Sequence, residues 1–302
     1  MARAAVTFTS GAARAPVARV TTLRSGRGAA WHRLARNHLA LSGGLMLSVV
    51  VVAAVFAPVL SPRDPLLMNP AQLLEPPSPG HWLGTDEFGR DILSRVIWGA
   101  RISLYVGGIA VSIAVVAGVS LGLVSGYYGR LLDEVTARVL DVVFAFPSIL
   151  LALGIVGALG PGLTNTMIAI GIVYTPVYAR LTRGTTLSIR EREFVAAATL
   201  CGASDLRILR SHVLPNVAAP LIVQTSLSLS LAILAEASLS FLGLGTQPPD
   251  PSWGTMVNTG QRLIELSPWP VIFPGLAIIV AVLGFNLLGD AIRDVIDPRL
   301  VN

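Results

Sequence analysis

The chain contains no lysine, and all 22 of its basic residues are arginine. A Walker A phosphate loop needs a lysine on the nucleotide phosphates and a Schiff-base site needs an amine, so neither can be built from this chain alone. Cys201 is the only cysteine, which excludes an internal disulfide and a Cys-x-x-Cys metal or redox site. The histidines, His32, His38, His81 and His212, follow no metal-ligand spacing. The sequence therefore predicts no catalytic residue, metal or cofactor in this chain.

Charged residues are also scarce, at 13% of the chain against 53% hydrophobic residues. The mean hydropathy is +0.69. Six stretches with few or no charges are each near the ~20 residues that a helix needs to span a bilayer core. They are Leu39 to Leu60, Ile102 to Val124, Val142 to Leu159, Leu163 to Ala179, Val217 to Phe241 and Val271 to Leu288. The sequence predicts an all-α membrane protein with six transmembrane helices.

Acidic residues are absent from positions 1–38, which hold seven arginines. Such a start is typical of an organellar transit peptide, but the span at 39–60 that follows is too long for a signal-peptide core. We interpret 1–38 as a cytoplasmic tail, because basic flanks hold the cytosolic side of a first helix.

This orientation makes three further segments cytoplasmic, and with the tail they hold 17 of the 22 arginines. The outer segments hold the other five, as the positive-inside rule requires. Both termini are therefore expected in the cytoplasm. The cytoplasmic segments are 125–141, 180–216 and 289–302; the outer ones are 61–101, after the first helix, and 242–270, within the five-helix domain 102–302.

Within the spans, Gly118, Gly122 and Gly126 recur at four-residue spacing, which favours a face on which another helix packs closely over general glycine enrichment. Glu236 lies in the fifth span, where an ionisable group costs on the order of 3 kcal/mol if central. It either lines a substrate path or hydrogen-bonds a neighbouring helix. Asn286 in the sixth span is a further pore or packing candidate.

The segment "REREFVAAATLCGASDLRILRSHVLPN" at 190–216 stands between two spans and is too polar to enter lipid. Its pattern predicts one short helix over Arg190 to Cys201, which Gly202 breaks. Ser204 or Asp205 caps a second helix, in which apolar residues recur until Pro215 ends it. We expect a compact pair of helices with a smooth, alanine-rich surface.

Part of this segment, "AAATLCGASDLRILRSHVLP", resembles the cytoplasmic signature of ABC importer permeases. That signature is Glu-Ala-Ala, a glycine after three residues, and Ile-x-Leu-Pro after nine more. Here Ala196 replaces the glutamate and His212 replaces the isoleucine, while the spacing survives. The matching positions are Ala196, Ala197, Ala198, Gly202, Leu214 and Pro215.

Three further stretches resemble the C-type permeases of the dipeptide, oligopeptide and nickel branch of that family. They are "HWLGTDEFGRDILSRVIWGARISL" at 81–104, "AEASLSFLGLG" at 235–245 and "GFNLLGDAIRDVIDPRL" at 284–300. With the signature, the resemblance covers residues 39–300. It implies a type I ABC importer permease of the bacterial plasma membrane, which carries short peptides; nickel or glutathione is the alternative cargo.

The resemblance also implies partners: a second, homologous permease as heterodimer, two ATPase subunits that bind ATP and Mg, and an extracytoplasmic substrate-binding protein. No nucleic acid partner is expected. Segment 180–216 would carry a coupling helix seated in a groove of an ATPase subunit. The residues expected there are Ala196, Ala197, Ala198, Gly202, Ala203, Ser204, Asp205, Leu206, Arg207, Leu214 and Pro215.

In the outer segment, Asp86 and Arg90, then Asp91 and Arg95, stand at i,i+4 spacing on a helix expected after Gly84. We expect these pairs to stabilise a surface helix near the pore mouth; a contact with the substrate-binding protein is the alternative.

Two other classes of function remain as rivals. An ion-coupled secondary transporter or channel would need an intramembrane ion network, for which Glu236 is the clear candidate, with Asp141 and Asp290 at helix ends. An intramembrane enzyme is disfavoured because His-Glu-x-x-His is absent from the sequence.

Overall fold

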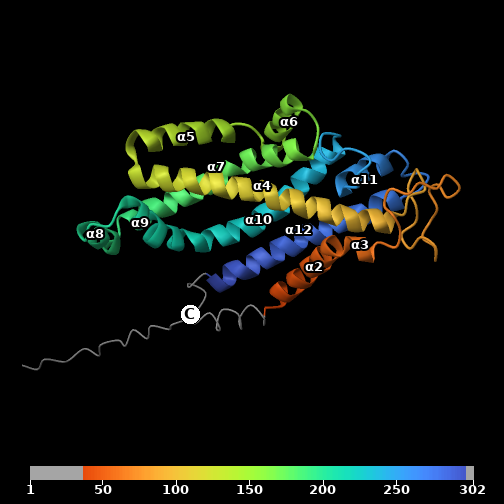
Figure 1. Ribbon diagram of the computed structural model, residues 1–302, viewed down its shortest axis with the longest axis horizontal. Helices are drawn as coiled ribbons and strands as arrows, with labels where there is room; N and C mark the ends of the chain where they lie inside the picture. Colours follow the sequence, from red (N-terminus) through yellow and green to blue (C-terminus); the bar gives the residue numbers. More distant parts are fainter. Residues whose placement is uncertain (1–36, 297–302) are drawn as a thin grey trace, which may run out of the picture.

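The computed structural model describes residues 37–296, which form a bundle of long helices (Figure 1). The predicted tail at 1–38 lies almost entirely outside this range. Apart from one isolated β-bridge, the regular structure of the described residues is helical. In chain order the elements are α2 (His38–Val55), α3 (Ala57–Leu60), α4 (Ile92–Tyr128), α5 (Arg130–Phe144), α6 (Ser148–Leu159), α7 (Leu163–Arg190), α8 (Glu193–Leu200), α9 (Asp205–Ile208), the π-helical turn η1 (Leu209–Val213), α10 (Leu214–Phe241), α11 (Trp253–Gln261) and α12 (Trp269–Ile296).

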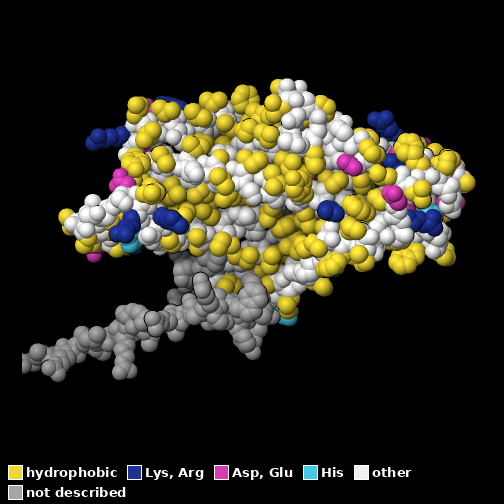
Figure 2. Space-filling model, viewed as in Figure 1, with side chains coloured by type: hydrophobic (Ala, Val, Ile, Leu, Met, Phe, Trp, Pro, Cys, Tyr) yellow, Lys and Arg dark blue, Asp and Glu magenta, His cyan; other side chains and the backbone are white. Residues whose placement is uncertain are grey.

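By length and hydropathy, four helices of the described chain can each cross a membrane: His38–Val55, Ile92–Tyr128, Asp205–Phe241 and Trp269–Val295. The α5–α6 pair makes a fifth candidate if it counts as one span. The fourth predicted span lies in α7, which is not among these candidates because its polar residues lower its mean hydropathy. With 28 residues, α7 is about 42 Å long at ~1.5 Å per residue. Hydrophobic side chains cover much of the face in Figure 2, as lipid contact requires.

Three predicted spans differ in extent from the observed helices. The second begins at Ile92, so residues 92–101 are helix and not part of an outer linker. The first is interrupted at Phe56, and α3 follows. The third is not one helix, because α5 and α6 meet at an angle of 92°. Pro147 explains this break, since a proline disfavours helical geometry in the residue before it.

The core of the bundle is the pair α4 and α7, which pack closely along their length. A Cβ at Gly118 would stand 2.5 Å from the Cβ of Tyr178, and one at Gly126 would stand 2.9 Å from the Cβ of Thr186. Any side chain at these positions would force the helices apart. The glycines at four-residue spacing therefore lie on the α4 face that contacts α7.

The connecting segments gather at the two ends of the bundle (Figure 1). At one end lie the α4–α5 turn and the segment from α8 to η1. At the other end lie α11 and the irregular chain of residues 61–91. Most charged side chains visible in Figure 2 also lie towards these ends. The segments that the arginine distribution places on one side of the membrane thus share one end of the molecule.

Candidate functional site

The segment between α7 and α10 folds as two short helices joined by a tight turn. Helix α8 covers Glu193–Leu200, slightly less than the predicted range. The turn that follows α8 contains Gly202, whose φ of +79° is the left-handed conformation that glycine adopts most easily. The Ala203 amide donates to the carbonyl of Ala198 at 3.0 Å, which closes the turn. The predicted helix break is therefore present at Gly202.

The second half of the segment differs from the prediction. Ser204 stands at the N-cap position of α9, but its side chain makes no capping hydrogen bond. Pro215 does not end this helix, because the chain continues through η1 into α10 and places Pro215 in the first turn of α10. A proline is tolerated there, since the amide that it lacks has no intrahelical acceptor. Such π-helical turns are frequent at functional sites.

The segment has one face attached to the bundle and one face free. Val195, Ile208 and Val213 are buried and join the main hydrophobic core. On the free face, the Leu200 side chain is 89% exposed and the Leu206 side chain 75%. Of the eleven residues expected at an ATPase contact, nine are exposed and two half-buried. The half-buried ones are Ala198 and Ala203; the exposed ones are Ala196, Ala197, Gly202, Ser204, Asp205, Leu206, Arg207, Leu214 and Pro215.

One hydrogen bond joins this segment to the end of α4, and a second joins the ends of α4 and α7. The Tyr127 hydroxyl donates to Asp205 Oδ1 at 3.0 Å. Arg190 Nη1 donates to the Tyr127 carbonyl oxygen at 2.9 Å. Tyr127 was not among the predicted residues, because a tyrosine at the end of an apolar span carries no signal for the distant partner that folding brings to it.

The polar residues within the spans connect helices. Glu236 on α10 is fully buried and accepts hydrogen bonds from the hydroxyls of Ser240 at 2.7 Å and Ser103, on α4, at 3.2 Å. Asn286 on α12 accepts from the Ser230 hydroxyl of α10 at 2.7 Å. In this conformation, Glu236 links α10 to α4 through the Ser103 hydroxyl, and its side chain has no exposed surface.

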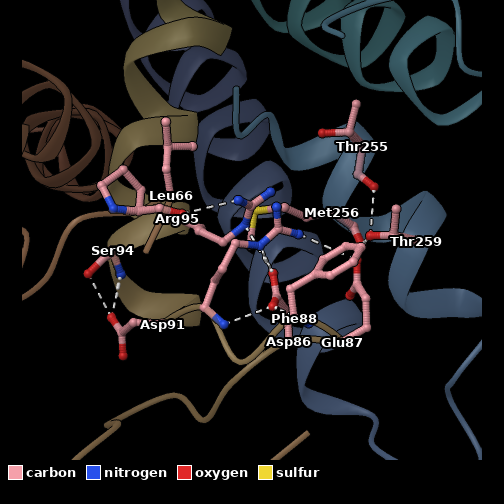
Figure 3. A network of polar contacts seen from close by, with 12 residues as sticks. Leu66, Asp86, Glu87, Phe88, Asp91, Ser94, Arg95, Thr255, Met256 and Thr259 are labelled. Carbon is pink, nitrogen blue, oxygen red and sulfur yellow. Dashed lines mark hydrogen bonds and ion pairs between the residues drawn. The ribbon is translucent and has the colours of Figure 1, made fainter. Parts of the chain in front are cut away.

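Four charged residues of the outer segment, Asp86, Arg90, Asp91 and Arg95, are buried, and Figure 3 shows polar contacts of this region. Asp86 Oδ2 accepts from Arg90 Nε at 2.7 Å and lies 3.4 Å from Arg95 Nε. Asp91 accepts from the Ser94 amide at 2.8 Å and so caps α4. Each of the four residues is at most 6% exposed.

The predicted surface helix through these residues is wrong. Residues 85–91 form a loop closed by the bridge between Thr85 and Asp91, and the helix begins only at Ile92. The expected pair of Asp91 and Arg95 does not form, because the Asp91 carboxylate caps the helix instead. With the side chains buried, a direct contact of Asp86, Arg90, Asp91 and Arg95 with another protein is also not supported.

An open groove lies between α6, α7 and α10. Its volume is 340 Å³, and its lining is mostly apolar. Ile149, Ala152, Val173, Tyr174, Leu231 and Ala235 contribute side chains to it. The groove is wide enough for a small molecule or for side chains of a neighbouring subunit.

Comparison with known proteins identifies the family. Residues 118–302 match the binding-protein-dependent transport system inner membrane component, and residues 27–77 match the N-terminal TM domain of oligopeptide transport permease C. The chain belongs to the family of binding-protein-dependent transport system inner membrane components. The predicted identity as a membrane permease subunit is thereby confirmed.

Curated relatives of this permease cover almost its whole length. The dipeptide transport system permease protein DppC of Alkalihalophilus pseudofirmus is 47% identical over 271 residues, 90% of this chain and 89% of the relative. The di/tripeptide transport system permease protein DppC of Pseudomonas aeruginosa is 47% identical over 278 residues, 90% of this chain and 92% of the relative. The glutathione transport system permease protein GsiD of Pectobacterium atrosepticum is 42% identical over 286 residues, 94% of this chain and 95% of the relative.

A solved structure shares the fold of this permease. A chain of the inward-facing MetNI methionine ABC transporter superimposes with a TM-score of 0.55 at 17% sequence identity. The match covers 68% of this chain and 97% of that one. This similarity confirms the ABC transporter permease fold that the sequence resemblance predicts.

Proposed function

We propose that this chain is the permease subunit of an ATP-driven importer of short peptides and forms half of its translocation pathway. The observation that carries the proposal is the exposed, alanine-rich face of the segment from α8 to α9, which is held at one end of the bundle by buried residues. Similarity to dipeptide and di/tripeptide permeases over 90% of the chain supports the peptide cargo.

The proposed complex contains a second, homologous permease as heterodimer partner, two ATPase subunits and an extracytoplasmic substrate-binding protein. The family description, a binding-protein-dependent transport system, supports the last of these. ATP and Mg would bind to the ATPase subunits. The absence of lysine from this chain supports that division, because a Walker A loop requires one.

In this mechanism, ATP binding draws the ATPase subunits together and displaces the segment from α8 to η1. Val195, Ile208 and Val213 connect that segment to the core, so its displacement moves the bundle helices. Rigid-body movement of the two permeases then opens the pathway outward to accept substrate. The chain would lie in a bacterial plasma membrane, with both termini in the cytoplasm, as the arginine distribution supports.

The test is uptake by the complete complex in proteoliposomes. We expect ATP-dependent accumulation of a radiolabelled dipeptide, such as Ala-Ala, when the substrate-binding protein is present. Unlabelled peptides should compete, and glutathione and Ni²⁺ should not. Glutathione is the second candidate cargo, because a glutathione permease is 42% identical to this chain. If glutathione competed and unlabelled peptides did not, the cargo would be glutathione. Uptake that is independent of ATP would overturn the proposal.

A further inference from the structure

Helix α9 is connected to α10 through the π-helical turn η1, and on its other side to α7 through the turn at Gly202 and α8. The turn covers Leu209–Val213 and connects α9 to α10 without a break. Wider turns of this kind depart from regular α-helical hydrogen bonding and rarely extend beyond a single turn. A displacement of α9 can therefore be partly absorbed at η1, unless a connection in addition to the core packing of Ile208 holds α9 in place.

Tyr127 supplies such a connection. It lies in the last turn of α4, and its hydroxyl donates to the Asp205 carboxylate at the first residue of α9. Arg190 at the end of α7 binds the Tyr127 carbonyl oxygen, which fixes the backbone from which the ring projects. One residue earlier, Gly126 lies against Thr186 of α7. Tyr127 thus extends from the tightest helix pair in the bundle to the start of α9.

We propose that Tyr127 is a positioning residue of the segment from α8 to η1, a role that rests on the proposed function of this chain. Its hydroxyl holds Asp205 so that a displacement of α8 and α9 moves the α4–α7 pair and is not absorbed at η1. Tyr127 acts through Asp205 and does not itself contact an ATPase subunit. The ring packs against the main core, and its hydroxyl makes the connection.

Tyr127→Phe removes the hydroxyl and keeps the ring, so the bundle should still fold. Tyr128→Phe is the matched control, because no hydrogen bond of the Tyr128 hydroxyl is present among residues 37–296 and its side chain is about half exposed. Loss of one solvent-exposed hydrogen bond should change the population of the held state by about three- to tenfold.

The first measurement uses the full chain alone, in lipid nanodiscs. Cys201 is the only cysteine and is exposed, so a nitroxide attached to it reports on the turn between α8 and α9. We expect Tyr127→Phe to increase the mobility of the spin label and Tyr128→Phe to leave it unchanged. In an Asp205→Ala background, Tyr127→Phe should add no further mobility. Equal spectra for wild type and Tyr127→Phe, or equal effects of both tyrosine variants, would overturn the proposal.

The second measurement uses the assembled complex and counts peptides transported per ATP hydrolysed. Tyr127→Phe should lower this ratio about three- to tenfold, while the complex elutes intact and the ATPase rate is retained. A greater label mobility with an unchanged ratio would refute the positioning role. Failure of the wild-type complex to transport peptide would instead refute the proposed function, and the spin-label result on the isolated chain would still stand.

Discussion

Gly122 of α4 lies directly against Ala179 of α7, and a Cβ at position 122 would stand 2.5 Å from the Ala179 carbonyl oxygen. The same Cβ would stand 2.6 Å from the Cβ of Thr182. The atom it would meet first belongs to the backbone, so a side-chain rotation cannot relieve the clash. The absence of a side chain at position 122 therefore sets how closely α4 and α7 approach each other.

Gly122→Ala should destabilise the bundle by about 1 to 3 kcal/mol, the usual cost of overpacking a closely packed site. The measurement is the thermal unfolding midpoint of the purified chain in detergent. Gly108→Ala is the control on the same helix, because a Cβ there would have no neighbour within 4 Å. Equal midpoints for Gly122→Ala and wild type would mean that α4 and α7 do not pack in this way.

Glu236→Leu should lower stability by about 1 to 3 kcal/mol, because the buried hydroxyls of Ser103 and Ser240 lose their acceptor. Glu236→Gln retains a carbonyl oxygen and should lose less. Retention of the folded, monodisperse chain after heating measures both effects. A Glu236→Leu protein as stable as wild type that no longer supports transport would place Glu236 in the substrate path instead.

The sequence predicts well those features that depend on local chemistry. Gly202 marks the turn after α8 because few other residues adopt its left-handed conformation easily. This preference can be recognised from the residue type alone. The glycines of α4 indicate a packed face because their spacing matches the helical period. The spans follow from hydropathy in the same way, although their exact ends do not.

The sequence did not correctly predict features in which one residue can take several roles, or in which its partner lies far away along the chain. Asp91 has the spacing for a helical ion pair with Arg95, but its carboxylate caps α4 instead. Its Oδ1 also lies 2.9 Å from Nδ1 of His81. Pro215 is a helix-ending residue by local rules, and here it stands at the start of α10, where those rules also allow it. Tyr127 could not be connected to Asp205 from the sequence, since 78 positions separate them.

Gly202→Glu should uncouple peptide transport from ATP hydrolysis in the complex and leave the bundle assembled. In the isolated chain, a Cβ at this position would have no neighbour within 4 Å, so the added side chain meets no clash there and its local cost is the strain of the positive φ. Asn tolerates the left-handed conformation better than Glu does. Gly202→Asn should therefore retain more transport than Gly202→Glu, as measured by peptide uptake and ATPase rate together. Full transport by the Glu variant would show that the turn lies away from any partner.

A topology test should place Leu73 outside the cell and Asn302 inside it. The arginine distribution, with 17 residues on one side and five on the other, is the reason for this expectation. The measurement compares reporter activity, or labelling by an impermeant reagent, after fusion at each position. Detection of both positions on the same side would contradict the six-span topology.

The central claim is that the segment from α8 to η1 contacts an ATPase subunit, and cross-linking from Cys201 tests it most directly. A photoreactive group attached to this exposed cysteine is illuminated in an assembled, transporting complex whose other subunits lack cysteine. The control carries Leu67→Cys in a Cys201→Ser background, because Leu67 is exposed and belongs to the irregular segment at the other end of the bundle. We predict a covalent product with an ATPase subunit from Cys201 and none from position 67. Products from Cys201 that contain only this chain would contradict the account, because the segment would then pack on its own bundle alone.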